Sequence, residues 1–187
     1  LHLSIRRQRQ MCIRDSPNIK ESQANKALVD AVSDMEGVAV FNLYELSQEI
    51  AFNVDEWSKI ISDASAVIYQ FPFYWMSAPS LLKKWQDEVF TFLSKTPAVA
   101  GKSLTVVTTT GSEYEAYRSG GRNRFTMDEL LRPYQVSAIH SGMSWQTPIV
   151  VYGMGTADAG KNIAEGANLY KQRVEMLIGS SNAGNNW

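Results

Sequence analysis

Residues that suit a bound phosphate or a flat ring gather in three loops of the chain. The first loop, SPNIKESQAN at 16–25, carries Ser22, Gln23 and Asn25 around the start of a predicted helix. Hydroxyl, amide and free backbone N–H groups at a helix N-terminus suit an anion such as phosphate. The simpler alternative is that Ser22 only caps the helix.

The other two loops each follow a predicted buried strand. In FPFYWMSAP at 71–79, three aromatic residues stand between two prolines. Aromatic side chains at the end of a strand are unfavourable in water unless they cover a flat ligand or pack in a core or at a dimer interface. In TTTGSEYEAY at 108–117, small hydroxyl residues and Gly111 allow a ligand to approach the backbone, although such a segment alone is also an ordinary turn.

Composition excludes several other kinds of chemistry. The chain has two histidines, His2 and His140, and one cysteine, Cys12, so histidine-based triads, zinc sites and an internal disulfide lack the residues they need. Lys and Arg number 18 against 19 Asp and Glu, so neither nucleic acid nor an anionic membrane surface is an expected partner. No apolar run approaches the roughly 20 residues of a membrane span. We therefore expect a protein of the reducing cytoplasm whose reactivity is carried by a bound cofactor.

Strands and helices alternate along most of the chain. Apolar residues at helical spacing predict a helix from Ser22 that ends at Gly37, and helices over 54–62, 79–93 and 158–178. In the helix over 79–93, one face carries Leu81, Leu82, Trp85, Val89, Phe92 and Leu93. β-Branched and aromatic runs predict strands at 38–44, 65–71, 103–111 and 148–153. This alternation is typical of an α/β protein with a parallel sheet, in which ligands bind beyond the carboxyl ends of the strands.

The first 16 residues lack this regularity. LHLSIRRQRQMCIRDS mixes a basic cluster with scattered apolar residues and shows neither helical nor strand period. It also lacks the continuous apolar stretch of a signal peptide, and it looks like translated sequencing-adaptor sequence. We expect 1–16 to be an atypical segment that contributes a poor strand or none, 17–179 to form one domain, and 180–187 to be a tail.

Several segments, taken in order, resemble the flavodoxin-like NAD(P)H:quinone oxidoreductase family, and most closely the ancillary oxidoreductases of glutathione-regulated potassium-efflux systems. The matching segments include SQANKAL, QFPFYWMSAPSLLKKWQDEVF, VVTTTGSEYEAY, NRFTMDELLRP and the SGMSW region, so the similarity covers about Pro17 to Ile178. The resemblance implies a flavodoxin-like three-layer sandwich whose five-stranded parallel sheet has the order 2-1-3-4-5. It also implies a homodimer, FMN more than FAD as the cofactor, and NAD(P)H as the co-substrate.

The resemblance also assigns roles to the three loops. It places the flavin phosphate on the loop that contains Ser16, Pro17, Ser22, Gln23 and Asn25, with Ser16 where the family usually has a histidine. It places the isoalloxazine ring along Pro72, Phe73, Tyr74, Trp75 and Met76. A Thr-Thr-Gly-Gly turn whose N–H groups face the flavin corresponds to Thr109, Thr110, Gly111 and Ser112. Tyr117 matches a tyrosine near the flavin carbonyls, in a position to donate a hydrogen bond during the reaction.

Three functions are compatible with these features. The first is an enzyme that takes a hydride from NAD(P)H onto FMN and passes it to a quinone or a similar acceptor. The second is a regulatory subunit that docks on a potassium-efflux transporter, at the cytoplasmic side of the inner membrane. The third is a pure electron carrier, which a net charge of −1 disfavours because carriers of the flavodoxin type are strongly acidic. The sequence does not separate the first two.

Overall fold

The strands of the protein form one parallel sheet. The computed structural model describes residues 9–16, 22–46 and 51–183. The strands are β1 (Arg9–Arg14), β2 (Val38–Asn42), β3 (Ala64–Pro72), β4 (Ser103–Thr109), β5 (Ser144–Trp145) and β6 (Ile149–Val151). Their order is β2-β1-β3-β4-β5, and β6 also pairs with β4. Since β5 pairs with the start of β4 and β6 with its end, the two short strands share the fifth position, and the predicted order is confirmed.

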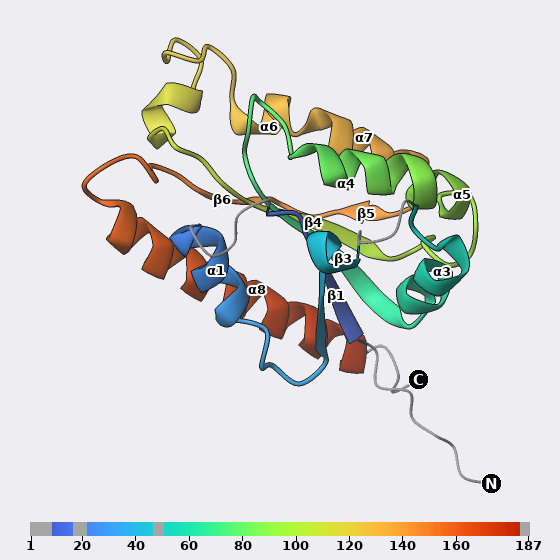
Figure 1. The fold of residues 1–187 in the computed structure, drawn as a ribbon. Helices are drawn as coiled ribbons and strands as arrows, with labels where there is room; N and C mark the ends of the chain where they lie inside the picture. The colour runs from blue at the N-terminus through green and yellow to red at the C-terminus, as the bar shows by residue number, and fades with distance from the viewer. Residues whose placement is uncertain (1–8, 17–21, 47–50, 184–187) are drawn as a thin grey trace, which may run out of the picture.

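Helices cover both faces of this sheet (Figure 1). One face is covered by α1 (Gln23–Asp30) and the long α8 (Ala159–Ala183). The other is covered by α3 (Val54–Ser62), α4 (Ser80–Trp85), α5 (Thr91–Leu93), α6 (Met127–Leu130) and α7 (Arg132–His140). The described residues also form three short helices: α2 (Leu43–Leu46), the π-helix η1 (Gln86–Phe90) and the 3₁₀-helix η2 (Tyr114–Tyr117). Each face therefore has its own apolar core, as a three-layer sandwich requires.

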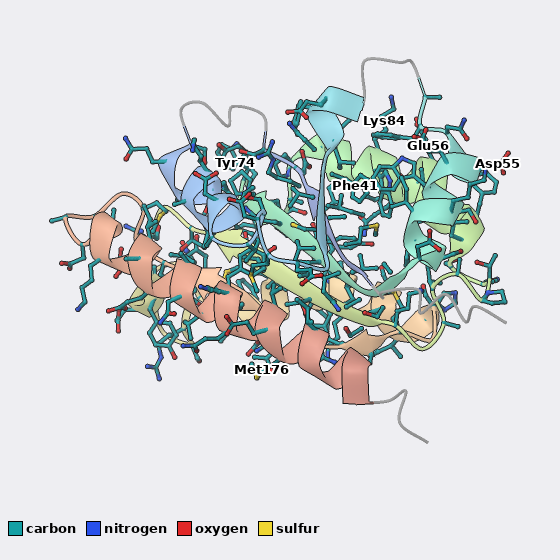
Figure 2. The ribbon with its side chains drawn as sticks, turned by 90° about the horizontal axis from the view of Figure 1, so that it is seen from below. Phe41, Asp55, Glu56, Tyr74, Lys84 and Met176 are labelled. Atoms are coloured by element: carbon teal, nitrogen blue, oxygen red, sulfur yellow. The ribbon has the colours of Figure 1, made fainter. Side chains whose placement is uncertain are left out.

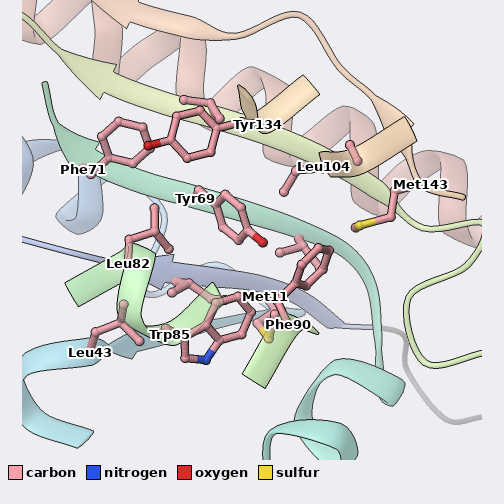
Figure 3. Close-up of a cluster of buried hydrophobic side chains, with 14 of the residues drawn as sticks. Met11, Leu43, Tyr69, Phe71, Leu82, Trp85, Phe90, Leu104, Tyr134 and Met143 are labelled. Carbon is pink, nitrogen blue, oxygen red and sulfur yellow. The ribbon is translucent and has the colours of Figure 1, made fainter. Parts of the chain in front are cut away.

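The larger core surrounds Trp85, which is fully buried (Figure 3). Its ring lies edge-on to Trp57 and Tyr69, with centroid distances of 5.2 and 6.0 Å. The predicted helix over 79–93 is present, but η1 inserts a wider turn that shifts the helical phase. As a result Phe90 packs in the core, whereas Phe92, which was predicted to face the core, is 64% exposed.

The first strand differs from the prediction of a poor or absent strand. Residues 10–14 pair in parallel with β2 on one side and with β3 on the other, and Met11, Cys12 and Ile13 are buried. The charged residues at its end have partners: Arg14 lies 3.9 Å from Glu45, and Asp15 accepts a 2.7 Å hydrogen bond from the backbone N–H of Leu82. A strand between two others is stabilised by both ladders and by both cores, so a weak local pattern suffices.

Candidate functional site

A cavity of about 350 Å³ opens where β3, β4 and β6 end. Since the carboxyl ends of parallel strands meet at one edge of the sheet, it brings together segments from all three loops that the sequence singled out. The predicted residues in its wall are Ser22, Gln23, Pro72, Phe73, Tyr74, Thr109, Thr110 and Gly111. Its volume lies in the range of about 300–1,000 Å³ that is typical of small-molecule sites.

The loop before α8 supplies a part of the wall that the sequence reasoning missed. Met154 precedes α8, and Ala159 and Ile163 belong to its first turns. Three backbone hydrogen bonds of 2.8–2.9 Å join this loop to the turn after β4, from the N–H groups of Gly153, Met154 and Gly155. The predicted strand at 148–153 could have pointed to this part of the wall, because its carboxyl end also lies at this edge of the sheet.

The start of α1 forms one end of the cavity. Ser22 occupies the N-cap position but makes no side-chain capping bond, which argues against the alternative that it only caps the helix. Its Oγ instead accepts a 3.2 Å hydrogen bond from the side chain of Asn25. The first N–H groups of a helix have no intrahelical acceptor, so they are available to an anion beside Ser22 and Gln23.

Two residues predicted to touch the phosphate are buried outside the cavity wall. Asn25 is 1% exposed, and its amide also donates a 3.2 Å hydrogen bond to Thr109 Oγ1, which joins α1 to the end of β4. Ser16 is buried just after β1, and its Oγ has no hydrogen-bond partner among the described residues. Pro17 lies outside the described residues.

The turn after β4 presents fewer free N–H groups than predicted. Thr110 N–H donates to the carbonyl of Val151 at 2.9 Å, so it is not available to a ligand. In the described part of the chain, Gly111 N–H has no backbone acceptor. A Cβ atom at Gly111 would meet no atom within 4 Å, so its backbone faces open space. Ser112 is not in the cavity wall, and its Oγ accepts a 2.6 Å hydrogen bond from Arg122.

The aromatic loop after β3 is divided between the cavity and the solvent. Phe73 is buried in the cavity wall, and the half-exposed Tyr74 lines the same cavity. Figure 2 shows Tyr74 beside α1. Tyr74 and Ser77 exchange two backbone hydrogen bonds, which close a tight turn with positive φ at both Trp75 and Met76. Two non-glycine residues with positive φ are unusual and mark backbone strain. Neither Trp75, which is 99% exposed, nor Met76 lies in the cavity wall, although both were predicted to lie along the ring.

Tyr117 lies next to the site without lining the same cavity. Its ring centroid is 6.1 Å from that of Phe73 and 5.9 Å from that of Tyr152. It lines a second cavity of about 650 Å³, which adjoins η2, α6, β6 and α8. The predicted catalytic tyrosine thus packs on Phe73, a residue of the wall of the first cavity, without lining that cavity itself.

The sequence of the chain matches a known protein family. Residues 9–174 match the model of a family described by its flavodoxin-like fold. The chain belongs to this flavodoxin-like family. Among curated relatives, the uncharacterized NAD(P)H oxidoreductase YdeQ of Bacillus subtilis is 35% identical over 86% of this chain and 83% of its own length. The glutathione-regulated potassium-efflux system ancillary protein KefG of Pectobacterium atrosepticum is 34% identical over 73% of this chain and 76% of its own length.

Solved structures are also similar to this chain. The general stress protein 14 of Treponema denticola, in complex with FMN, superposes with a TM-score of 0.82 and 27% identity over 90% of this chain and 99% of that one. An NADPH-quinone reductase from P. pentosaceus superposes with a TM-score of 0.76 and 26% identity over 89% and 97%. The family assignment agrees with the strand order and with the position of the cavity.

The residues at the cavity fit a flavin mononucleotide. A phosphate suits the start of α1 beside Ser22, and a flat ring suits the opposite part, where apolar side chains such as Phe73 and Met154 stand near the open backbone of Gly111. The Gly111 N–H, which has no backbone acceptor among the described residues, is placed there as well.

Proposed function

We propose that the chain binds FMN in this cavity and uses NAD(P)H to reduce quinones or similar acceptors. The observation that carries the proposal is the convergence of three loops on one cavity, with an anion-binding helix start and the open Gly111 backbone in its wall. A cavity of this size suits a mononucleotide better than FAD. The names of the oxidoreductase and quinone-reductase relatives and the FMN of the Treponema denticola structure support the same activity.

Different residues of the chain would bind the FMN phosphate and orient its ring. FMN, when bound, supplies the capacity to accept and return a hydride. The start of α1 with Ser22 and Gln23 would hold its phosphate, and the N–H of Gly111 would donate to a polar edge of the ring. Phe73 and Tyr74 would exclude water from one side and orient the ring.

We expect the purified protein to carry or take up FMN, and its absorbance to bleach when NADPH is added without oxygen. Released flavin is identified by chromatography, and the bleaching is followed near the visible absorption maximum. Addition of a quinone should restore the colour. Absence of any flavin binding after reconstitution would overturn the enzymatic function.

Tyr117 is proposed as the residue that donates a hydrogen bond during the reaction, because it packs on Phe73 at the edge of the site. We expect Tyr117→Phe to lower kcat about ten-fold, which corresponds to one hydrogen bond of about 1.4 kcal/mol, without changing FMN affinity. Tyr152→Phe, in the neighbouring ring, is the matched control. Equal kcat values for wild type and Tyr117→Phe would exclude this role.

We further propose a homodimer in which the turn at Trp75 closes the site of the partner. Tyr74, Trp75 and Met76 are 50%, 99% and 47% exposed beside the cavity, and such a patch is unfavourable in water. Light scattering at micromolar concentration should give twice the chain mass of 20.9 kDa. A monomer at that concentration contradicts the proposal.

A regulatory function is the second candidate, and the similarity to KefG favours it. In this case the protein would act in the cytoplasm, docked on a potassium-efflux transporter at the inner membrane. In the described ranges, no helix has the length and apolar character needed to cross a bilayer. Co-purification with a transporter from a native membrane extract distinguishes this function from that of a free enzyme.

A further inference from the structure

A chain of buried hydrogen bonds runs from α8 through the sheet to the candidate site. Tyr170 Oη donates to Cys12 Sγ at 3.1 Å, and Cys12 Sγ donates to Gln70 Oε1 at 3.7 Å. Gln70 Nε2 then donates to the backbone carbonyl of Asn25 at 3.0 Å. The Asn25 amide continues the chain to Ser22 and Thr109. Residues far apart in sequence, from α8, β1, β3 and α1, are thereby connected to the cavity.

The polar members of this chain lie in an otherwise apolar layer. Cys12 and Tyr170 belong to the core that includes Leu28, Val32 and Ile68. Gln70 is fully buried, and an unsatisfied amide there would be unfavourable. Burial raises the pKa of the Cys12 thiol to about 11 and that of Tyr170 well above its ordinary value, so both groups stay protonated donors at neutral pH.

Gln70 is the member that connects the sheet to the start of α1. It lies on β3, two residues before the strand ends in the cavity wall at Pro72. Its amide contacts the first turn of α1 at Asn25, three residues after Ser22. The Cys12 thiol occupies its Oε1, so the amide nitrogen is oriented toward α1. A shift of Gln70 would therefore move the helix start relative to the turn at Thr109.

We propose that Gln70, oriented by Cys12 and Tyr170, is a positioning residue that holds the start of α1 where it binds the phosphate of the cofactor. This inference rests on the proposed binding of FMN. Preorganised N–H groups bind an anion more tightly than groups that must first be ordered. Loss of the network should therefore weaken the contact with the phosphate and leave the contacts with the ring unchanged.

The test compares FMN with riboflavin, which lacks the phosphate, by quenching of flavin fluorescence. Gln70→Met retains a side chain of similar length without the hydrogen bonds. We expect it to raise the Kd for FMN about ten-fold, as loss of a hydrogen-bonded contact does, with the Kd for riboflavin nearly unchanged. Tyr170→Phe, which removes one hydroxyl, should raise the ratio of the Kd for FMN to the Kd for riboflavin about three-fold.

The matched control is Ile68→Val, on the same strand and the same face as Gln70. It lowers stability through packing alone and should leave the ratio of the two Kd values unchanged. Equal weakening of FMN and riboflavin by Gln70→Met, or an unchanged ratio in Tyr170→Phe if Gln70→Met does not fold, would overturn the inference. A wild-type protein that binds neither flavin would instead overturn the proposed function.

Discussion

The free energy of unfolding of Asp15→Asn, relative to that of wild type, is expected to increase by about 2–3 kcal/mol between pH 4 and pH 8. Asp15 is fully buried after β1, and desolvation raises the pKa of its carboxyl from 3.8 to about 6. Hydrogen bonds from the Leu82 N–H and the Tyr44 hydroxyl lower this pKa, but by less than burial raises it.

The sign follows from the direction of the shift. The folded protein holds the Asp15 proton more tightly than the unfolded chain does. The contribution of this proton to the free energy of unfolding is therefore fully present below pH 3.8 and is lost as the pH rises through about 6. Asparagine cannot ionise, and its side-chain oxygen can still accept from Leu82 N–H.

Urea denaturation of the flavin-free protein at several pH values measures this effect. The quantity of interest is the difference in free energy of unfolding between Asp15→Asn and wild type. Asp34→Asn, which removes a carboxylate at an exposed position, is the control. A difference for Asp15→Asn that is constant with pH would show that Asp15 ionises in the folded protein as easily as in the unfolded chain.

Gly111→Val is expected to weaken FMN binding about 100-fold or more while the flavin-free protein stays folded. Gly111 lines the candidate cavity, and a Cβ atom there meets no protein atom within 4 Å. The valine side chain would therefore extend into the space proposed for the flavin without disturbing the core. Any overlap with the ring costs affinity and not stability.

Ser112→Val provides a matched control, because it adds the same side chain one residue later. Ser112 is outside the cavity wall, and the change removes only a hydrogen bond with the exposed Arg122. We expect its FMN affinity to stay close to that of wild type. Fluorescence titration gives the affinities, and thermal melts of the flavin-free proteins test the fold. Normal FMN binding by Gly111→Val would place the flavin elsewhere.

Local pattern was sufficient to predict the alternation of strands and helices and most of the cavity wall. The run at 65–71 is largely apolar, and the run at 103–111 forms an equally buried strand, because both strands are covered on both faces; this covering requires helices between them. Parallel strands end at one edge of the sheet, so the loops that contain Ser22, Phe73 and Gly111 had to meet there. The inward position of Trp85 also followed from helical spacing alone.

Other features depend on contacts between distant residues, which local pattern does not record. The stretch Arg9–Arg14 shows a weak strand pattern, yet two ladders and the Leu82 N–H beside Asp15 make it an interior strand of the sheet. The wide turn at Gln86–Phe90 changes the helical phase, so Phe92 faces solvent. Asn25 lies beneath the cavity and not in its wall, because Gln70 and Thr109, which follow it by 45 and 84 residues, hold it there. Burial and hydrogen bonding over such separations arise only when the chain has folded.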